Sequence, residues 1–206
     1  MQTKILLFDF DGTIADSADA AMRAYNEVAS QNNYRMISKA DLPVLRSRSA
    51  MDNVRDFGIP LLKLPFIVKK VRTALKKEIP NFKAIEGMAE SLKLLKGKGY
   101  KLYIISSNSR ENMRSFLEHN RIDEFDDIYS VSSFFGKHAK IKSLLKAHHW
   151  EKSFVMYIGD EVRDIEAARK ADVTSVAVTW GYNTEKALAK NNPDILLRNP
   201  SELSSL

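Results

Sequence analysis

A short apolar run that ends in two carboxylates most constrains what this chain can fold into. In the stretch KILLFDFDGTIADS, the run ILLF is followed by Asp9 and Asp11, two positions apart. A short apolar run bounded by turn signals is typical of a buried strand. Asp11-Gly12 predicts a chain reversal, although such a pair is also a common simple turn. Because side chains two positions apart share one face of a strand, the two acids predict an anionic site that needs a counter-ion nearby.

Composition places the chain among globular proteins. Its 206 residues, 44% hydrophobic and 28% charged, fit one domain with an insertion or two small domains. The absence of cysteine excludes disulfides, thiol catalysis and thiolate metal sites. No apolar run approaches the roughly 18 residues of a membrane span, and the N-terminus does not resemble a secretory signal. We therefore expect a cytoplasmic protein without membrane association.

The positive charge is concentrated in one segment. Residues 16–83 contain thirteen Lys and Arg against seven Asp and Glu, whereas the rest of the chain has nineteen of each. The net charge of +6 therefore comes entirely from this segment. Such a field attracts anionic small molecules. It is equally compatible with nucleic acid, an anionic membrane surface or a merely solvated face.

Helical patterns fill that same segment, and strands alternate with helices on either side of it. Ser38 with Asp41 and Ser49 with Asp52 predict helix starts, and residues 65–79 carry an apolar stripe at helical spacing. After Pro80, strand patterns recur at 101–106, 127–130, 154–158, 173–178 and 195–197, with helical patterns between them. Alternation of this kind predicts a parallel α/β sheet. The helical segment is then an insertion after the first strand.

The carboxyl ends of the predicted strands gather polar residues that suit phosphate and magnesium. Ligands of parallel sheets bind beyond these ends, so side chains that are distant in sequence should meet there. The candidates are Asp9, Asp11, Ser106, Ser107, Asn108, Lys137, Asp160, Glu161 and Asp164. Hydroxyls at a helix N-terminus can hold a phosphate. A group of carboxylates needs a hard cation, and oxygen ligands favour Mg²⁺.

These motifs resemble the haloacid dehalogenase-like hydrolase superfamily, in its phosphoglycolate phosphatase-like and β-phosphoglucomutase-like branch. DFDGT, YIISSN and GDEVRD are similar to the family's first, second and fourth motifs, and the likeness covers essentially the whole chain. It implies a Rossmann-like parallel sheet core with helices on both faces, residues 1–16 and 84–206. A helical cap, residues 17–83, would be inserted after the first strand.

The resemblance also implies roles for the candidate residues. Asp9 would be the nucleophile and Asp11 the general acid and base of a phosphatase that forms an aspartyl-phosphate. Asp9, the Asp11 backbone carbonyl and Asp160 would bind Mg²⁺, with Glu161 or Asp164 in the outer shell. Ser106, Ser107, Asn108 and Lys137 would bind the phosphoryl group of a small-molecule phosphate ester.

Some questions stay open at this stage. The run Lys137-His138-Ala139-Lys140 departs from the family pattern, so either lysine is a candidate phosphate ligand. A sugar-phosphate mutase is an alternative, although Ala21 stands where such mutases usually have His. A non-catalytic binding module is another, but it needs no general acid, and few aromatics accompany the basic segment. We expect no nucleic-acid partner, and the oligomeric state and the particular ester remain undetermined. The charge leads to the hypothesis that Arg46, Arg48 or Arg55 binds a second anionic group of the substrate.

Overall fold

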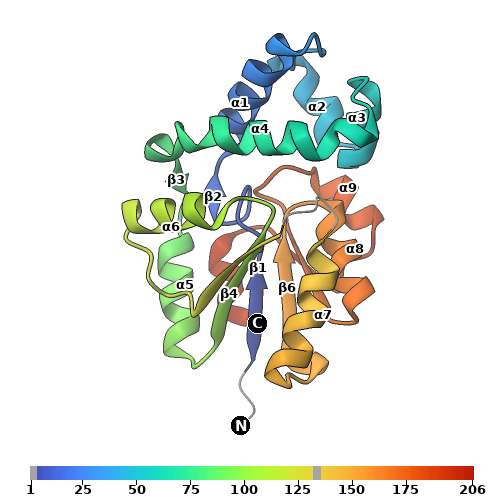
Figure 1. Ribbon diagram of the computed structural model, residues 1–206. Helices are drawn as coiled ribbons and strands as arrows, with labels where there is room; N and C mark the ends of the chain where they lie inside the picture. The colour runs from blue at the N-terminus through green and yellow to red at the C-terminus, as the bar shows by residue number, and fades with distance from the viewer. Residues whose placement is uncertain (1–3, 132–135) are drawn as a thin grey trace.

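A parallel sheet lies beneath a helical unit (Figure 1) in the computed structural model, which describes residues 4–131 and 136–206. The sheet is six-stranded, its order is β5-β4-β1-β6-β7-β8, and every neighbouring pair is parallel. These strands are β1 (Ile5–Phe8), β4 (Lys101–Ser106), β5 (Asp127–Ser130), β6 (Val155–Gly159), β7 (Thr174–Val178) and β8 (Ile195–Leu197). The predicted α/β class is confirmed, and the first strand of the chain lies at the centre of the sheet.

Both faces of β1 are buried, which explains its uninterrupted apolar sequence. Leu6 and Phe8 point to one face and Ile5 and Leu7 to the other, since successive side chains of a strand alternate. Helices α5 (Met88–Gly97) and α6 (Arg110–His119) cover the first face. Helices α7 (Lys137–His148) and α8 (Val162–Ala171) cover the second. With the core filled on both sides, only the strand ends remain available for a ligand.

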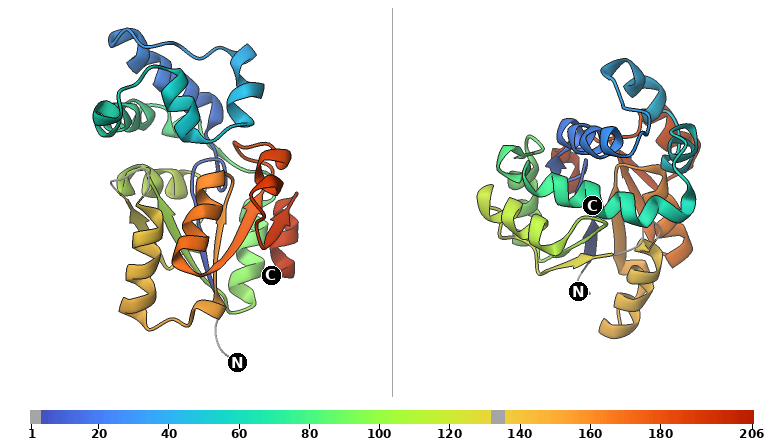
Figure 2. Two further views of the ribbon diagram at one scale, coloured as in Figure 1. Left: turned by 90° about the vertical axis from the view of Figure 1, so that its right-hand side faces the viewer. Right: turned by 45° about the horizontal axis from the view of Figure 1, so that its top comes forward.

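Four helices of the inserted segment stand over the carboxyl ends of the strands (Figures 1 and 2). They are α1 (Ala18–Gln31), α2 (Leu42–Arg46), α3 (Ala50–Asp56) and α4 (Leu64–Lys76). This segment has an apolar cluster of its own, which includes Val28, Phe57 and Ile67. We call residues 17–83 the cap. Other cap residues, such as Ala24 and Leu75, belong to the apolar cluster of the core, so the cap packs on the core as well as within itself.

Two short strands connect the cap to the core. Strands β2 (Ala15–Asp16) and β3 (Lys83–Ala84) pair antiparallel, so the chain enters and leaves the cap side by side. Helix α4 ends at Lys76 and a 3₁₀ turn, Ile79–Asn81, follows it, whereas the sequence pattern ran on without a break. Helix α7 starts at Lys137 itself and not after it. Helix α9 (Glu185–Lys190) was not predicted from the sequence pattern.

Within residues 4–131 and 136–206, no helix is both long and apolar enough to cross a membrane.

Candidate active site

A tight loop holds Asp9 at the carboxyl end of β1. The Asp9 backbone N–H donates to the Ile158 carbonyl of β6 at 2.8 Å, and its Oδ1 accepts the Phe10 N–H at 2.7 Å. The Phe10 carbonyl accepts the N–H groups of Ile14 and Ala15 at 2.9 and 3.0 Å, which folds the chain back at once. Asp9 is 1% exposed. Its other oxygen, Oδ2, is therefore presented from a backbone that is fixed on both sides.

Lys137 is the counter-ion of Asp9. Its Nζ lies 2.6 Å from Asp9 Oδ2 and 2.5 Å from Asp164 Oδ1, and the side chain is 2% exposed. Within the described residues Asp9 Oδ2 has no hydrogen bond of normal geometry, so its link to Lys137 is ionic. Lys140, the other candidate, lies on the Tyr129 ring with Nζ 4.3 Å from the ring centroid. Lys137 is thus the lysine that the fold brings to Asp9.

Three buried carboxylates meet beside this lysine. One oxygen each from Asp9, Asp160 and Asp164 lies within 4.8 Å of the other two. Asp160 is fully buried and accepts the Thr13 hydroxyl at 2.8 Å and the Tyr182 N–H at 2.7 Å. Burial raises the pKa of Asp160 well above its ordinary value, and neighbouring carboxylates, Glu161 first, add to the effect. Burial likewise raises the pKa of Asp164 to about 6, against the charge of Lys137.

This group of oxygens fits a divalent cation. Lys137 pairs with two of the three buried acids, Asp9 and Asp164, and carboxylates so close together repel one another unless further positive charge is bound. The donor set is all oxygen, which Mg²⁺ prefers. Glu161 lies at the edge of this group: its N–H donates to Asp164 Oδ2 at 3.1 Å, and its carboxylate pairs with Arg163. Asp9, Asp160 and Asp164 are therefore the residues that could hold the cation.

Asp11 differs from the other acids in its surroundings. It is half-buried, and the Asn108 amide nitrogen donates to its two oxygens at 3.1 and 3.3 Å. Burial and the charge of Asp9 raise the pKa of Asp11 to about 6, although hydrogen bonds from Ser17 and Asn108 oppose the shift. A carboxyl group with this pKa can both give and take a proton near neutral pH. Asp11 is thus chemically suited to acid–base work.

The predicted phosphate-binding residues lie at the end of β4, next to the start of α6. Ser106 is buried, and its Oγ accepts the Asn108 backbone N–H at 3.1 Å. Ser107 is half-buried in the same turn. The Asn108 side chain is engaged with Asp11 and also accepts the Asn112 amide at 3.0 Å. Ser106 therefore lies in the predicted place, whereas the side-chain amide of Asn108 is directed at the acid.

Sequence reasoning missed the loop that follows β7. Trp180 Nε1 donates to the Thr13 carbonyl at 3.0 Å, and the Tyr182 N–H reaches Asp160. A Cβ added to Gly181 would lie 2.3 Å from the Asp160 Cβ, so only glycine permits this approach. Asn183 Oδ1 accepts the Val162 N–H of α8 at 2.9 Å. The sequence Gly181-Tyr182-Asn183 indicates a turn. It does not indicate these contacts, because they join residues that are distant in sequence.

The three arginines considered from the sequence have partners of other kinds. Arg46 donates to the Tyr182 and Gly181 carbonyls at 2.7 and 2.6 Å, which ties the cap to the loop after β7. Arg48 pairs with Asp56, and Arg55 lies 3.8 Å from Asp52. Arg46 thus connects the cap to the core, whereas Arg48 and Arg55 lie beside carboxylates on the exposed surface of the cap.

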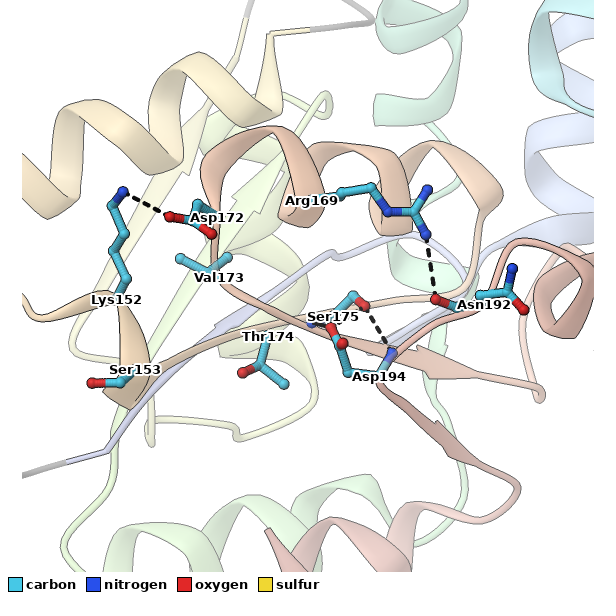
Figure 3. Close-up of a pocket in the computed structure, with 9 residues that line it drawn as sticks. All are labelled: Lys152, Ser153, Arg169, Asp172, Val173, Thr174, Ser175, Asn192 and Asp194. Atoms are coloured by element: carbon cyan, nitrogen blue, oxygen red, sulfur yellow. Dashed lines mark hydrogen bonds and ion pairs between the residues drawn. The ribbon is translucent and has the colours of Figure 1, made fainter.

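An open hollow of about 460 Å³ lies at the other end of the sheet (Figure 3). Its polar groups largely pair with one another: Lys152 with Asp172 at 3.0 Å, and Asp194 with the Ser175 hydroxyl at 2.6 Å. Val173 and Thr174, at the start of β7, line it. The hollow is thus separate from the acids at the carboxyl ends of the strands.

Comparison with known proteins agrees with this fold. The family model described as haloacid dehalogenase-like hydrolase matches residues 6–178. A phosphoglycolate phosphatase from Synechococcus elongatus is 34% identical over 199 residues, covering 96% of this chain and 94% of that protein. The pyrophosphatase PpaX of Listeria welshimeri is 24% identical, with 98% and 94% covered. A solved structure of a haloacid dehalogenase-like family protein from Streptococcus pneumoniae superposes with a TM-score of 0.81 at 21% identity, covering 98% and 97%.

These findings define a hydrolase with a parallel α/β sheet and a group of acidic residues at the carboxyl ends of its strands. The chain belongs to the haloacid dehalogenase-like hydrolase family, in its phosphoglycolate phosphatase-like branch. The resemblance stated from the sequence motifs is confirmed.

Proposed function

We propose that this protein is a magnesium-dependent phosphatase that hydrolyses a small-molecule phosphate monoester through an aspartyl-phosphate on Asp9. The observation that carries the proposal is the pairing of two different aspartates at one strand end. Asp9 is fixed, buried and ion-paired with Lys137 at 2.6 Å, whereas Asp11 is half-buried with its pKa raised to about 6. This difference supports Asp9 as the nucleophile and Asp11 as the group that transfers protons.

In the first half-reaction, Asp9 Oδ2 attacks phosphorus and the bond from phosphorus to the ester oxygen breaks. Protonated Asp11 gives its proton to that oxygen, so the product leaves as an alcohol. In the second half-reaction, ionised Asp11 takes a proton from water, whose oxygen attacks phosphorus. Inorganic phosphate leaves, and the Asp9 carboxylate and protonated Asp11 are restored.

Other residues would stabilise the charge on the phosphoryl group. A phosphate ester repels a carboxylate nucleophile, so positive charge and N–H or O–H donors are needed at the phosphoryl oxygens. Lys137 supplies the charge beside Asp9, and Ser106 with the N-terminus of α6 supplies donors. Mg²⁺ would be held by Asp9, Asp160 and the Asp11 carbonyl. Asp164, although close enough to be a ligand, is paired with Lys137 and would lie around them with Glu161. When bound, Mg²⁺ offsets the charge of nucleophile and substrate.

The relatives suggest the kind of ester. Phosphoglycolate and pyrophosphate, the substrates that the names of two relatives print, each carry a second anionic group beside the phosphoryl group that is transferred. The basic cap faces the site, and its charge favours doubly anionic substrates over neutral alcohol phosphates. We therefore place 2-phosphoglycolate first among the substrates to be tested.

The test measures release of inorganic phosphate from a panel of esters. The esters are 2-phosphoglycolate, p-nitrophenyl phosphate and glucose 6-phosphate. Pyrophosphate, a phosphoanhydride, is added because of the second relative, and each compound is assayed with MgCl₂ or with EDTA. We expect Mg²⁺-dependent turnover of at least one ester by the parent protein and none by the Asp9→Asn variant. Turnover that survives both EDTA and Asp9→Asn would contradict the proposal.

A further inference from the structure

Arg72 is a cap residue that contacts the core at the edge of the active site. It lies on α4, and its Nη2 donates to the Val131 carbonyl, directly after β5, at 3.1 Å. Its backbone carbonyl accepts the Asn112 amide of α6 at 3.3 Å. Asn112 in turn donates to Asn108, whose amide contacts Asp11. The α4 backbone and the proposed general acid are thus linked through two asparagines.

The guanidinium group of Arg72 is close enough to interact with the site. Burial lowers the pKa of Arg72, and the Asp11 carboxylate acts against this, whereas the charge of Arg163 adds to it. Arg72 is therefore within electrostatic range of the acid from the cap side and of an arginine from the core side.

Arg72 also retains unused donors. Among the described residues, its buried Nε has no hydrogen-bond partner, and no carboxylate oxygen lies within ion-pair distance of its nitrogens. The other cap arginines differ: Arg23, Arg35, Arg48 and Arg55 lie beside carboxylates, and Arg46 donates to two carbonyls. A guanidinium has five N–H groups in a planar fork that matches a carboxylate or phosphate. The arrangement leaves Arg72 with charge and donors for a ligand.

We propose that Arg72 binds the second anionic group of the substrate and so selects doubly anionic phosphate esters over esters with a neutral alcohol. This inference rests on the phosphatase activity proposed above. The phosphoryl group would lie at Asp9 and Lys137, and the second group would point toward the cap. Arg72 takes the place of Arg46, Arg48 and Arg55 in the hypothesis drawn from charge alone.

The experiment compares two esters that differ only at that second group. One is 2-phosphoglycolate, and the other is 2-hydroxyethyl phosphate, in which a neutral CH₂OH replaces the carboxylate. Variants Arg72→Ala and Arg72→Lys are assayed with Mg²⁺ beside the parent. Lys76→Ala is the matched control, because Lys76 lies one turn further along α4 and pairs with Glu111 on the surface at 2.7 Å. Circular dichroism verifies that each variant is folded.

We expect Arg72→Ala to lower kcat/KM for 2-phosphoglycolate about 10- to 100-fold, the range for a lost hydrogen bond to a charged group. The change should lie mainly in KM, since the interaction is the same in ground and transition states. For 2-hydroxyethyl phosphate, kcat/KM of Arg72→Ala should change less than about 3-fold. With 2-phosphoglycolate, kcat/KM of Arg72→Lys should lie between the values of the parent and of Arg72→Ala. Lys76→Ala should leave the ratio of kcat/KM for the two esters unchanged.

Equal losses on both esters, or none on 2-phosphoglycolate, would overturn the role of Arg72 while leaving the phosphatase intact. If Arg72→Ala does not fold, the ratio of the two esters in Arg72→Lys decides the question. A parent that hydrolyses neither these esters nor the wider panel overturns the proposed function, and this inference falls with it.

Discussion

Replacement of Lys137 by methionine should destabilise the fold strongly in the absence of metal. The Lys137 ammonium lies 2.6 Å from Asp9 and 2.5 Å from Asp164, and all three side chains are 2% exposed. Removing one partner of a buried ion pair leaves an uncompensated charge, which typically costs about 3–5 kcal/mol. Methionine preserves most of the volume, so the loss should come from charge rather than from a cavity. We expect a decrease of about 3–5 kcal/mol in the free energy of unfolding.

Urea unfolding followed by tryptophan fluorescence, in EDTA at pH 7.5, measures this difference. Lys140→Met is the matched control: it lies in the same helix and interacts with the Tyr129 ring, a contact worth about 0.5–1 kcal/mol at an exposed site. Adding Asp164→Asn to Lys137→Met should recover part of the loss, because the amide needs no counter-ion. A Lys137→Met variant within about 1 kcal/mol of the parent, or no more costly than Lys140→Met, would refute the reasoning.

Three further predictions concern the neighbours of the acids. Asn108→Ala removes an N–H donor that stabilises ionised Asp11, so the pKa of Asp11 should rise. The alkaline limb of the pH profile of kcat/KM should then move upward by about 1–2 pH units. An unmoved limb would count against Asp11 as the acid. Gly12 has φ +75°, and an added Cβ would lie 2.3 Å from Asp160 Oδ2, so Gly12→Ala should weaken Mg²⁺ binding in calorimetry. Gly58→Ala, at φ +67°, controls for backbone strain and should not weaken it, because no described residue other than its chain neighbours has an atom within 4 Å of the added Cβ. Burial raises the pKa of Asp160 in the metal-free fold, so this group keeps its proton above about pH 4, where it ionises in the unfolded chain, and its contribution to stability is lost as pH rises from there toward the folded-state pKa. In urea titrations Asp160→Asn should therefore lose less stability than the parent as pH rises, and an identical slope would contradict this prediction.

Much of the core could be predicted from sequence because its signals are local. Strands β5 and β8 coincide with the predicted 127–130 and 195–197, and helix α8 fills the predicted helical interval between 154–158 and 173–178. Apolar runs report burial on both faces, and a parallel sheet then brings the strand ends together without further information. For this reason the amino-acid sequence alone was enough to assign Asp9 and Asp160 to one site.

The remaining features depend on tertiary contacts. The choice of Lys137 over Lys140 follows from which face of α7 packs on the sheet, and a helix pattern alone left both open. Arg46 donates to carbonyls of a loop that lies 135 residues away in sequence. The sequence therefore suggested that its N–H donors were available for a ligand, although the loop occupies them. Arg72 is one of many cap cations in the sequence, and only the tertiary structure shows its contact with Val131 and, among the described residues, its unpartnered Nε. Local periodicity does not encode such partners.

The most direct test of the central claim is to look for phosphate on Asp9. The Asp11→Asn variant keeps the nucleophile but lacks the base that activates water, a contribution of typically about 10²–10⁴-fold to the rate. Incubated with p-nitrophenyl phosphate and Mg²⁺, then quenched in acid, it should show the mass of one added phosphoryl group, and peptide mapping should place that group on Asp9. The Asp9→Asn variant should show none. Phosphate on the Asp9→Asn variant, or on a residue other than Asp9, would contradict the mechanism.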